Sequence, residues 1–313
     1  RLVGLGIGLA ALALAVVFTT VARGGRPAPP CAAVGDAVGR VWNEARRAAI
    51  QQAFAASGRG HGAGSFDRVS GLLDAYASAW RLQRVETCQA TRARHEQSDA
   101  LHDLRVACLA RRMQSLEATV AYLERANAVA VDESVRVAGD LPRLADCEDR
   151  DQLSRRVPLP EEAERRRRVV DAEAELATAQ VRRRAGQVDA ARELATSLLE
   201  RARPLGYSPL TADVLFLVAD LDQAAGDDEH ARRLLDETIQ TAAAAGADAL
   251  AAKAWALKLY IEALVDQTPS SAWASTRAAA EAAATRANDP RLVAALHNTV
   301  GLVAKASGDA RLA

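Results

Sequence analysis

Aromatic side chains make up only 4% of the 313 residues, although half of the residues are hydrophobic. A β-sandwich needs β-branched and aromatic residues, so this composition argues against one. Alanine supplies much of the hydrophobic content, which favours helices packed closely through small side chains. Because 40 basic and 40 acidic residues cancel, no net charge draws the chain to nucleic acid. We therefore expect an all-α protein that does not bind nucleic acid.

Recognisable catalytic motifs are also missing. The sequence has no phosphate-binding Gly-Lys loop, no nucleophile elbow and no His-Glu-x-x-His signature. His95 and His102 lie seven residues apart and could share a helix face, but Glu96 and Asp99 fall off that face. We expect no catalytic residue, no cofactor site and no metal site in this chain.

The four cysteines all precede residue 150, and none belongs to a C-x-x-C pair: Cys31, Cys88, Cys108 and Cys147. This pattern predicts two disulfides formed in an oxidising compartment, with free buried thiols as the alternative. A chain reversal near residue 97 would place Cys88 opposite Cys108, which favours that bridge and leaves Cys31 with Cys147. The pairing of Cys31 with Cys88 and Cys108 with Cys147 stays open.

Residues 2–22 contain no charge, and these 21 residues are long enough for a membrane span at about 1.5 Å per residue. We expect a transmembrane helix over residues 1–23, with a signal peptide as the alternative. Residues 24–33, rich in proline and glycine, form a predicted linker. The sequence begins at Arg1 rather than Met and stops at Ala313 inside a repeat, so we expect a fragment of a longer protein.

Two signals disagree on the side of the membrane. Arg23 and Arg26 follow the span, so the positive-inside rule read literally favours a cytoplasmic C-terminal part. The cysteines favour an oxidising compartment instead. We give the cysteines more weight and expect a single-pass protein of the bacterial cytoplasmic membrane, with residues 24–313 on the extracytoplasmic side.

Helical periodicity marks out the next part of the chain. Apolar residues recur at helical spacing in residues 34–57, and the glycines of residues 58–64 end that pattern. A second helix is predicted from about Phe66 and a third after Ser98, which is suited to be its N-terminal cap. We expect a Cys-containing helical bundle in residues 34–156 and, after the prolines near residue 158, a linker with a helix start in residues 157–170.

Two series of turn-forming residues recur every 40 to 42 residues after residue 170. The first contains Gly186, Gly226 and Gly308, with Gln267 at the missing position, and an alanine follows each of the four after five residues: Ala191, Ala231, Ala272 and Ala313. The second contains Gly206, Gly246 and Asn288. Such residues tolerate the left-handed conformation that ends a helix. The sequence therefore predicts stacked helical hairpins at about 171–207, 208–247, 248–288 and 289–313, the last truncated.

The turn sequences resemble those of tetratricopeptide repeats. The resemblance rests on Ala185-Gly186-Gln187-Val188-Asp189-Ala190-Ala191 and on the corresponding residues 225–231 and 307–313. The period here is longer than in that family, and most of the family's Trp and Tyr positions are replaced. The resemblance implies a longer variant of the repeat, built as a superhelix of hairpins.

The whole layout is similar to the region after the kinase domain in large bacterial transmembrane serine/threonine protein kinases with tetratricopeptide tails. It is carried by the span, the linker and the runs Val41-Trp42, Asp74-Ala75-Tyr76-Ala77-Ser78-Ala79-Trp80, Thr87-Cys88-Gln89-Ala90-Thr91 and Ala145-Asp146-Cys147. This resemblance implies a missing cytoplasmic kinase domain that uses ATP and Mg²⁺, and it makes this chain the sensing and docking part. Signal binding would then change the pairing of spans in a homodimer. The alternative is a membrane-anchored periplasmic tetratricopeptide adaptor without a kinase domain.

Stacked hairpins would line a concave surface with their first helices. Such a surface can hold an extended peptide or a partner helix, so we expect a protein or peptide partner, and an unoccupied solvated face is the alternative. Counting back from each turn gives the candidate contact residues Arg183, Asp213, Asp220, Gln223, Leu257, Ile261, Asn298 and Lys305.

Overall fold

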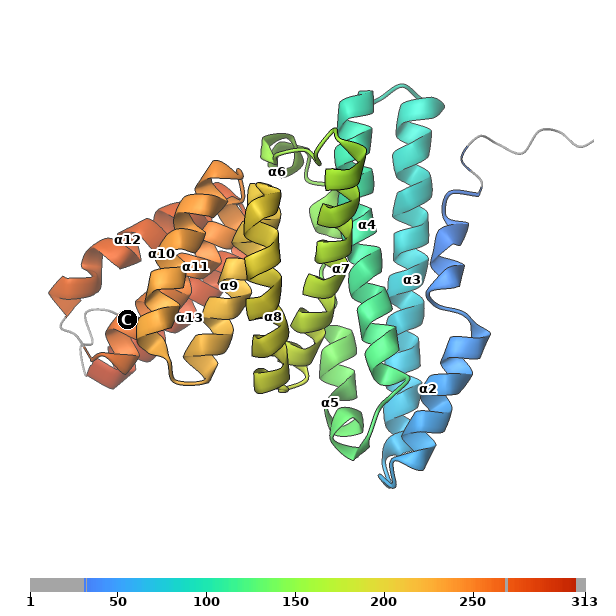
Figure 1. The fold of residues 1–313 in the computed structure, drawn as a ribbon, viewed down its shortest axis with the longest axis horizontal. Coiled ribbons are helices and arrows are strands. Elements are labelled where there is room, and N and C mark those ends of the chain that lie inside the picture. The colour runs from blue at the N-terminus through green and yellow to red at the C-terminus, as the bar shows by residue number, and fades with distance from the viewer. Residues whose placement is uncertain (1–30, 32, 268–269, 308–313) are drawn as a thin grey trace, which may run out of the picture.

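The computed structural model describes residues 31, 33–267 and 270–307, and every regular element within them is a helix (Figure 1). The predicted all-α fold is confirmed for this part of the chain. A helical bundle comes first, and consecutive helical hairpins lie beside it. Among the described helices, none combines the length and the apolar character needed to cross a bilayer. The span predicted at residues 2–22 lies outside the described residues.

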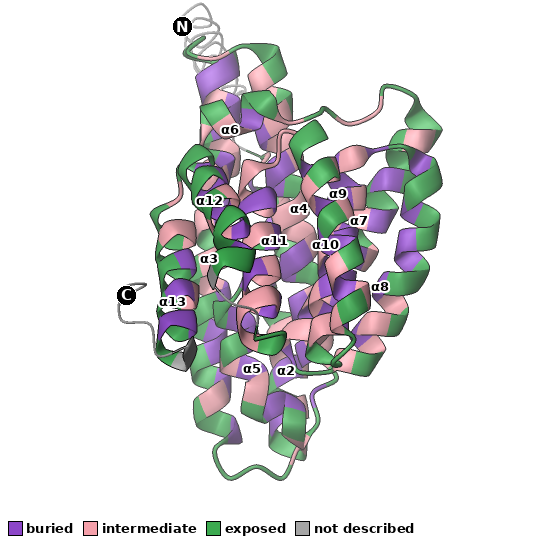
Figure 2. Cartoon of the chain, turned by 90° about the vertical axis from the view of Figure 1, so that its left-hand side faces the viewer, coloured by how far each residue is buried: buried purple, intermediate pink, exposed green. Residues whose placement is uncertain are grey.

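The bundle consists of α2 (Glu44–Ala56), α3 (Gly62–Arg92), α4 (Asp99–Leu123) and α5 (Ala128–Gly139). The side chains of Asn43, Ser98 and Asn127 each accept a hydrogen bond from the backbone N–H three residues later. These bonds satisfy N–H groups that have no partner at a helix start, and they confirm the predicted cap at Ser98. The apolar sides of the helices meet in one core, and buried residues are purple in Figure 2.

The helix predicted over residues 34–57 is interrupted. Asp36–Arg40 forms a short 3₁₀ helix, and α2 begins only at Glu44. The Trp42 indole N–H donates to Asp74 on α3 at 2.7 Å, while Asn43 has an extended backbone and caps α2. These contacts hold a break in the chain that apolar periodicity does not reveal.

Both disulfides are present, and no described cysteine is free. Their connectivity is the one left open, Cys31–Cys88 and Cys108–Cys147, so the favoured bridge between Cys88 and Cys108 is wrong. The reason is the offset of α3 against α4, where the Trp80 indole donates to the Leu109 carbonyl at 2.8 Å. Counted from that contact, Cys88 lies opposite about residue 101, roughly 10 Å along α4 from Cys108.

The hairpins follow in order. The first is α7 (Ala163–Arg184) with α8 (Val188–Ala202), and the second is α9 (Ser208–Ala224) with α10 (Asp228–Ala244). The third is α11 (Asp248–Tyr260) with α12 (Ser270–Ala287), and α13 (Pro290–Ser307) comes after it. The arrangement is therefore repeat-like, with one helical hairpin packed on the next.

All turn positions of the two predicted series that the structure describes adopt a positive φ: Gly186, Gly206, Gly226, Gly246, Gln267 and Asn288. The predicted register of left-handed turns is thus confirmed, and Gly308 lies outside the described residues. Gln267, the apparent gap in the series, has a φ of 51°. A side chain in this conformation costs about 1 kcal/mol, which glycine would avoid. The conformation therefore recurs even where the residue type does not.

The third hairpin contains two more residues than the second. Gly226 lies 20 residues after Gly206, whereas Gln267 lies 21 after Gly246 and Asn288 a further 21 after that. The first extra residue is accommodated by a π-helical turn, Ile261–Val265, which directly continues α11. Such turns are the usual result of inserting one residue into an α-helix.

The second extra residue shifts the start of α12. Ala191 and Ala231, in the first turn of the second helix of their hairpins, are fully buried. In the third hairpin Ala272 is exposed and Trp273 is buried instead. Ala191, Ala231 and Trp273 each lie 15 residues before the left-handed residue that ends the second helix. Ala272 continues the alanine series in the sequence but does not occupy the place of Ala191 and Ala231, which a tryptophan fills one position later.

Residues 143–166, which we call the edge strap, connect the bundle to the hairpins and contain η2 (Ala145–Cys147), α6 (Arg150–Arg155) and the first turn of α7, which carries Arg165. The strap contacts each of the three turns between hairpins. Arg165 donates to the carbonyls of Leu205 and Gly206 at 2.7 and 2.9 Å, and Gln152 donates to the carbonyl of Ala287 at 2.8 Å. These bonds satisfy carbonyls left unpaired at helix ends. Figure 1 shows α6 between the bundle and the hairpins.

The middle turn meets the strap most closely. A Cβ atom added at Gly246 would lie 2.2 Å from the carbonyl oxygen of Arg155. We predict that Gly246→Ala costs at least 3 kcal/mol of unfolding free energy, because it adds this backbone clash to the cost of a positive φ, about 1–2 kcal/mol. Urea denaturation followed by circular dichroism measures the difference.

Gly226→Ala is the matched control. Gly226 has a φ of 84°, but no atom lies within 4 Å of its added Cβ. This variant should lose only the conformational cost of about 1–2 kcal/mol. Equal losses in the two variants would show that the strap does not press on the turn at Gly246.

Candidate binding groove

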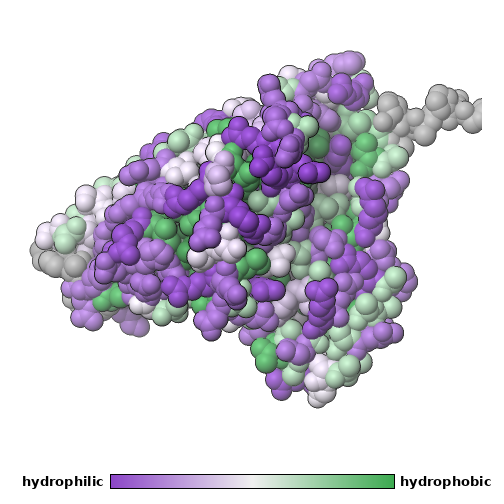
Figure 3. All heavy atoms as spheres, viewed as in Figure 1, coloured by the Kyte–Doolittle hydropathy of each residue, from purple (hydrophilic) through white to green (hydrophobic). Residues whose placement is uncertain are grey.

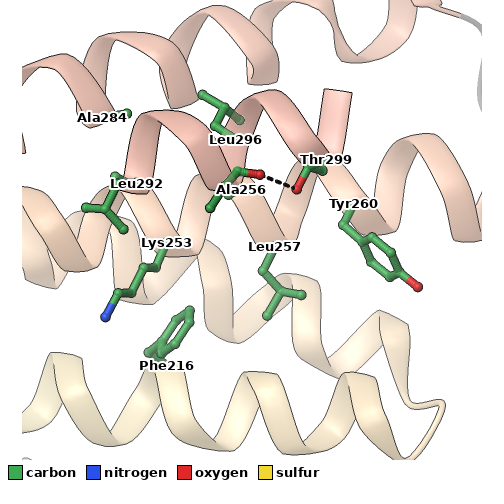
Figure 4. A pocket seen from close by; sticks show the side chains of 11 residues that line it. Phe216, Lys253, Ala256, Leu257, Tyr260, Ala284, Leu292, Leu296 and Thr299 are labelled. Atoms are coloured by element: carbon green, nitrogen blue, oxygen red, sulfur yellow. Dashed lines mark hydrogen bonds between the residues drawn. The ribbon is translucent and has the colours of Figure 1, made fainter. Parts of the chain in front are cut away.

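An open groove of about 300 Å³ lies on the face that α9, α11 and α13 share, with α12 beneath it (Figure 4). Its volume is at the lower end of the range for small-molecule sites, and it could also take one or two large side chains of a partner. Elsewhere in the described part of the chain, no two exposed large hydrophobic residues are adjacent in the sequence. Figure 3 shows mainly hydrophilic side chains with separate small hydrophobic areas on the side of the molecule that it presents.

Small side chains create the hollow. Four alanines from three helices line it: Ala252, Ala256, Ala284 and Ala295. The larger apolar side chains around them are Phe216 on α9, Leu257 on α11, and Leu292 and Leu296 on α13. Helices carry all of these side chains, so the groove is formed before any ligand arrives. An apolar group that enters it leaves water, which is favourable by about 25 cal/mol per Å² of buried apolar surface.

Lys253 brings a positive charge to the groove. Figure 4 shows its amino group at one end, on the side of Phe216. No carboxylate in the described part of the chain forms an ion pair with Lys253, whereas Lys258 on the same helix pairs with Asp236. The Thr299 hydroxyl already donates to the carbonyl of Ala295 at 3.2 Å. The groove therefore suits an apolar group that carries a carboxylate near one end.

The π-helical turn begins where the groove ends along α11. Tyr260 lines the groove and is the last residue of α11 before the π-helical turn. The next residue, Ile261, is fully buried. The Ile261 N–H still donates to the Leu257 carbonyl, so Ile261 keeps its α-helical position, and the inserted residue rotates only the side chains that follow it, by about 100° around the helix axis. The part of α11 that lines the groove thus stops at Tyr260.

The structure separates the eight candidate contact residues. Leu257 lines the groove, while Ile261 belongs to the core. Arg183 and Asp220 form an ion pair of 2.7 Å between α7 and α9. Of the other four, Gln223 is partly exposed, Asn298 and Lys305 are exposed on α13, and Asp213 faces a charged cluster described next. Sequence reasoning missed Phe216, although its position between Asp213 and Asp220 at helical spacing could have indicated it.

At the first hairpin, the bundle contacts α7. Arg111 of α4 lies 3.6 Å from Glu173 of α7, and both belong to a cluster that also contains Arg156, Tyr207 and Asp213. The Tyr207 hydroxyl donates to the Val157 carbonyl in the strap at 3.2 Å. Burial raises the pKa of Glu173 to about 7, although Arg111 opposes that rise. This junction joins the bundle, the strap and the first two hairpins through partly buried charges.

The raised pKa gives a prediction for Glu173→Gln. Between pH 4.5 and about 7 the folded protein keeps a proton on Glu173 that the unfolded chain releases. Stability from this group therefore falls as pH rises through that window. The unfolding free energy of Glu173→Gln minus that of the wild type should therefore be larger at pH 8 than at pH 4.5. Urea denaturation of both proteins at the two pH values measures this change.

Glu175→Gln on the same helix has the opposite expected sign. A hydrogen bond from Arg201 lowers the pKa of Glu175, so its contribution is present above its usual pKa and is lost on acidification. This variant should be less stable than the wild type at pH 8 and closer to it at low pH. If the stability difference from the wild type changed with pH in the same direction for both variants, the raised pKa of Glu173 would be contradicted.

Comparison with known proteins gives no family for this chain. No family model matches it, and neither a curated protein nor a solved structure does. Its function has to be inferred from the groove, the hairpins and the disulfides themselves.

Proposed function

We propose that this chain is the non-catalytic sensing and protein-interaction region of a bacterial membrane serine/threonine protein kinase. The groove on α9, α11 and α13 carries the proposal, because it is a preformed apolar surface with one unpaired cation, suited to docking. The resemblance of the sequence to the tails of such kinases supports the link to a kinase domain. The partner is a protein or peptide.

The hairpins support a tetratricopeptide-like identity for the second half of the chain. Left-handed turns recur at fixed intervals, and Ala191 and Ala231 are fully buried in matching places. Each hairpin packs on its neighbours, which suits a scaffold that presents one continuous face to a partner. The resemblance in the turn sequences agrees with this geometry.

The two disulfides support an extracytoplasmic location. Bonds between Cys31 and Cys88 and between Cys108 and Cys147 form and persist in oxidising compartments, not in a reducing cytosol. They lie in the part of the sequence that follows the proposed span at residues 2–22. On this proposal the span separates the exported region from a kinase domain in the cytoplasm.

Signal transfer would depend on the junction between the hairpins and the bundle. A partner in the groove contacts α9, and α9 meets the charged cluster through Asp213. The same cluster contains Arg111 of α4 in the bundle. A change at the groove therefore has a contiguous path of packed and charged groups toward the membrane side of the chain.

Site-specific crosslinking tests the groove. With the photoreactive residue p-benzoylphenylalanine in place of Thr299, the full-length protein in its native cells should give a discrete crosslinked partner. Ala256→Trp should abolish that product, because the indole fills the groove, which Ala256 lines. Gel electrophoresis after irradiation reads out the result.

Two controls accompany this experiment. Ala294→Trp adds the same side chain at an exposed position of α13 that does not line the groove, so the product should persist. The photoreactive residue in place of Asn298, which is exposed outside the groove, should give no such product. Crosslinking that survives Ala256→Trp in protein with an unchanged melting temperature would refute docking in the groove.

The kinase link has its own test. The gene sequence upstream of the codon for Arg1 should encode a His-Arg-Asp catalytic loop and an Asp-Phe-Gly motif, which position the base and the magnesium ion in protein kinases. A short basic flank ending at an initiator Met would contradict the kinase proposal. It would support a membrane-anchored adaptor instead.

A further inference from the structure

Three potential metal ligands converge at the turn between α9 and α10, away from the groove. Asp222 lies near the end of α9, Asp227 caps α10, and His230 lies in the first turn of α10. One oxygen from each carboxylate and one ring nitrogen of His230 all lie within 4.8 Å of one another. Asp222 is only 1% exposed, so its charge needs strong compensation.

Arg192 supplies part of that compensation. Its Nε donates to Oδ1 of Asp222 at 2.5 Å, and its terminal nitrogen lies 3.4 Å from Oδ2 of Asp227. With His230 in the neutral form that binds metals, one guanidinium faces two carboxylates, so the cluster keeps a surplus of negative charge. This charge balance favours a further cation.

The second oxygen of Asp222 points to where that cation would lie. Oδ2 is buried and makes no hydrogen bond within the described residues. It lies 2.7 Å from Nδ1 of His230, but without the alignment of a hydrogen bond. A carboxylate oxygen and an imidazole nitrogen that approach in this way can both direct lone pairs at one shared ion. Buried polar atoms left without a hydrogen bond are uncommon and call for such an explanation.

The backbone holds these side chains together independently of any ion. Gly226 has a φ of 84°, and the N–H of Asp227 donates to the carbonyl of Asp222 at 2.9 Å. The N–H of His230 donates to Oδ1 of Asp227 at 3.3 Å. The turn therefore fixes the two carboxylates and the histidine at short range, which lowers the cost of binding.

We propose that Asp222, Asp227 and His230 bind a divalent transition-metal ion such as Zn²⁺. One imidazole and two carboxylates are ordinary zinc ligands, and three protein ligands leave a position for water. Mg²⁺ and Ca²⁺ prefer oxygen ligands only, so the histidine disfavours them. Arg192 orients Asp222 through its other oxygen, as groups behind a metal ligand commonly do. The ion would tie α9 to α10 at the turn of the second hairpin, while Arg192 of α8 holds one of its ligands.

Zinc titration of the full chain tests the proposal. Isothermal titration calorimetry with ZnCl₂ should show one equivalent bound, with a rise of several degrees in the melting temperature. CoCl₂ should give the visible absorption of a bound, nitrogen-ligated cobalt ion. His230→Gln and Asp227→Asn should each weaken zinc binding at least tenfold and remove the cobalt spectrum. These two side chains are not fully buried, so the variants should fold.

His61→Gln is the matched control. His61 lies 3.1 Å from Asp132, which also pairs with Arg59, but no second carboxylate joins that group to make three ligands. Zinc binding should be unchanged in this variant. The proposal is overturned if no saturable binding occurs by 1 mM ZnCl₂, or if binding survives His230→Gln. It is also overturned if His61→Gln loses binding to the same extent.

Discussion

The arrangement of the hairpins depends on the contact between the edge strap and the turns at Gly206, Gly246 and Asn288. In a repeat array each unit touches only its neighbours, so small rotations between units add up along the array. One segment that contacts three successive turns limits this addition. Arg165 and Gln152 bind carbonyls at two of the turns, and the strap backbone packs against Gly246 at the third.

The shape of the groove depends on these contacts between the edge strap and the turns. Its lining comes from α9, α11, α12 and α13, which belong to successive units, so any relative rotation of these units would open or close it. The bundle and the charged junction contact the first hairpin through α4, and the strap reaches as far as the third. Binding sites on rigid elements are more exact than sites on loops. Here the supporting contacts lie at one edge of the array and leave the groove open.

The turns and helix caps could be predicted from the sequence, whereas the disulfide pairing and the contacts of the strap could not. Turn residues such as Gly226 and the cap at Ser98 act through their own backbone, so their spacing is visible in a single chain. The disulfide pairing depends on how far α3 slides along α4, which the Trp80–Leu109 contact decides. The strap is equally hidden, because Gln152 and Ala287 meet across 135 residues.

The groove, too, could be predicted from the sequence only in part. Periodicity placed Leu257 and Ile261 on one face of α11, but only Leu257 lines the groove, while Ile261, one turn further along, is buried in the core. No sequence pattern shows which of the two side chains neighbouring helices cover, or where along a hairpin an inserted residue is accommodated. Packing against the neighbouring helices decides both. The same holds for Trp273, where the number of residues in the turn, rather than residue type, sets the buried position.

The disulfides also shorten the covalent route by which a pull on the N-terminal end would travel. Cys31–Cys88 joins residues 57 positions apart in the sequence, and Cys108–Cys147 joins residues 39 positions apart. Tension applied at Cys31 would run through residues 88–108 and then directly into the edge strap, without loading α2 or α5. A mechanical displacement at the N-terminal end would therefore reach the turns between hairpins before it could unravel the bundle core.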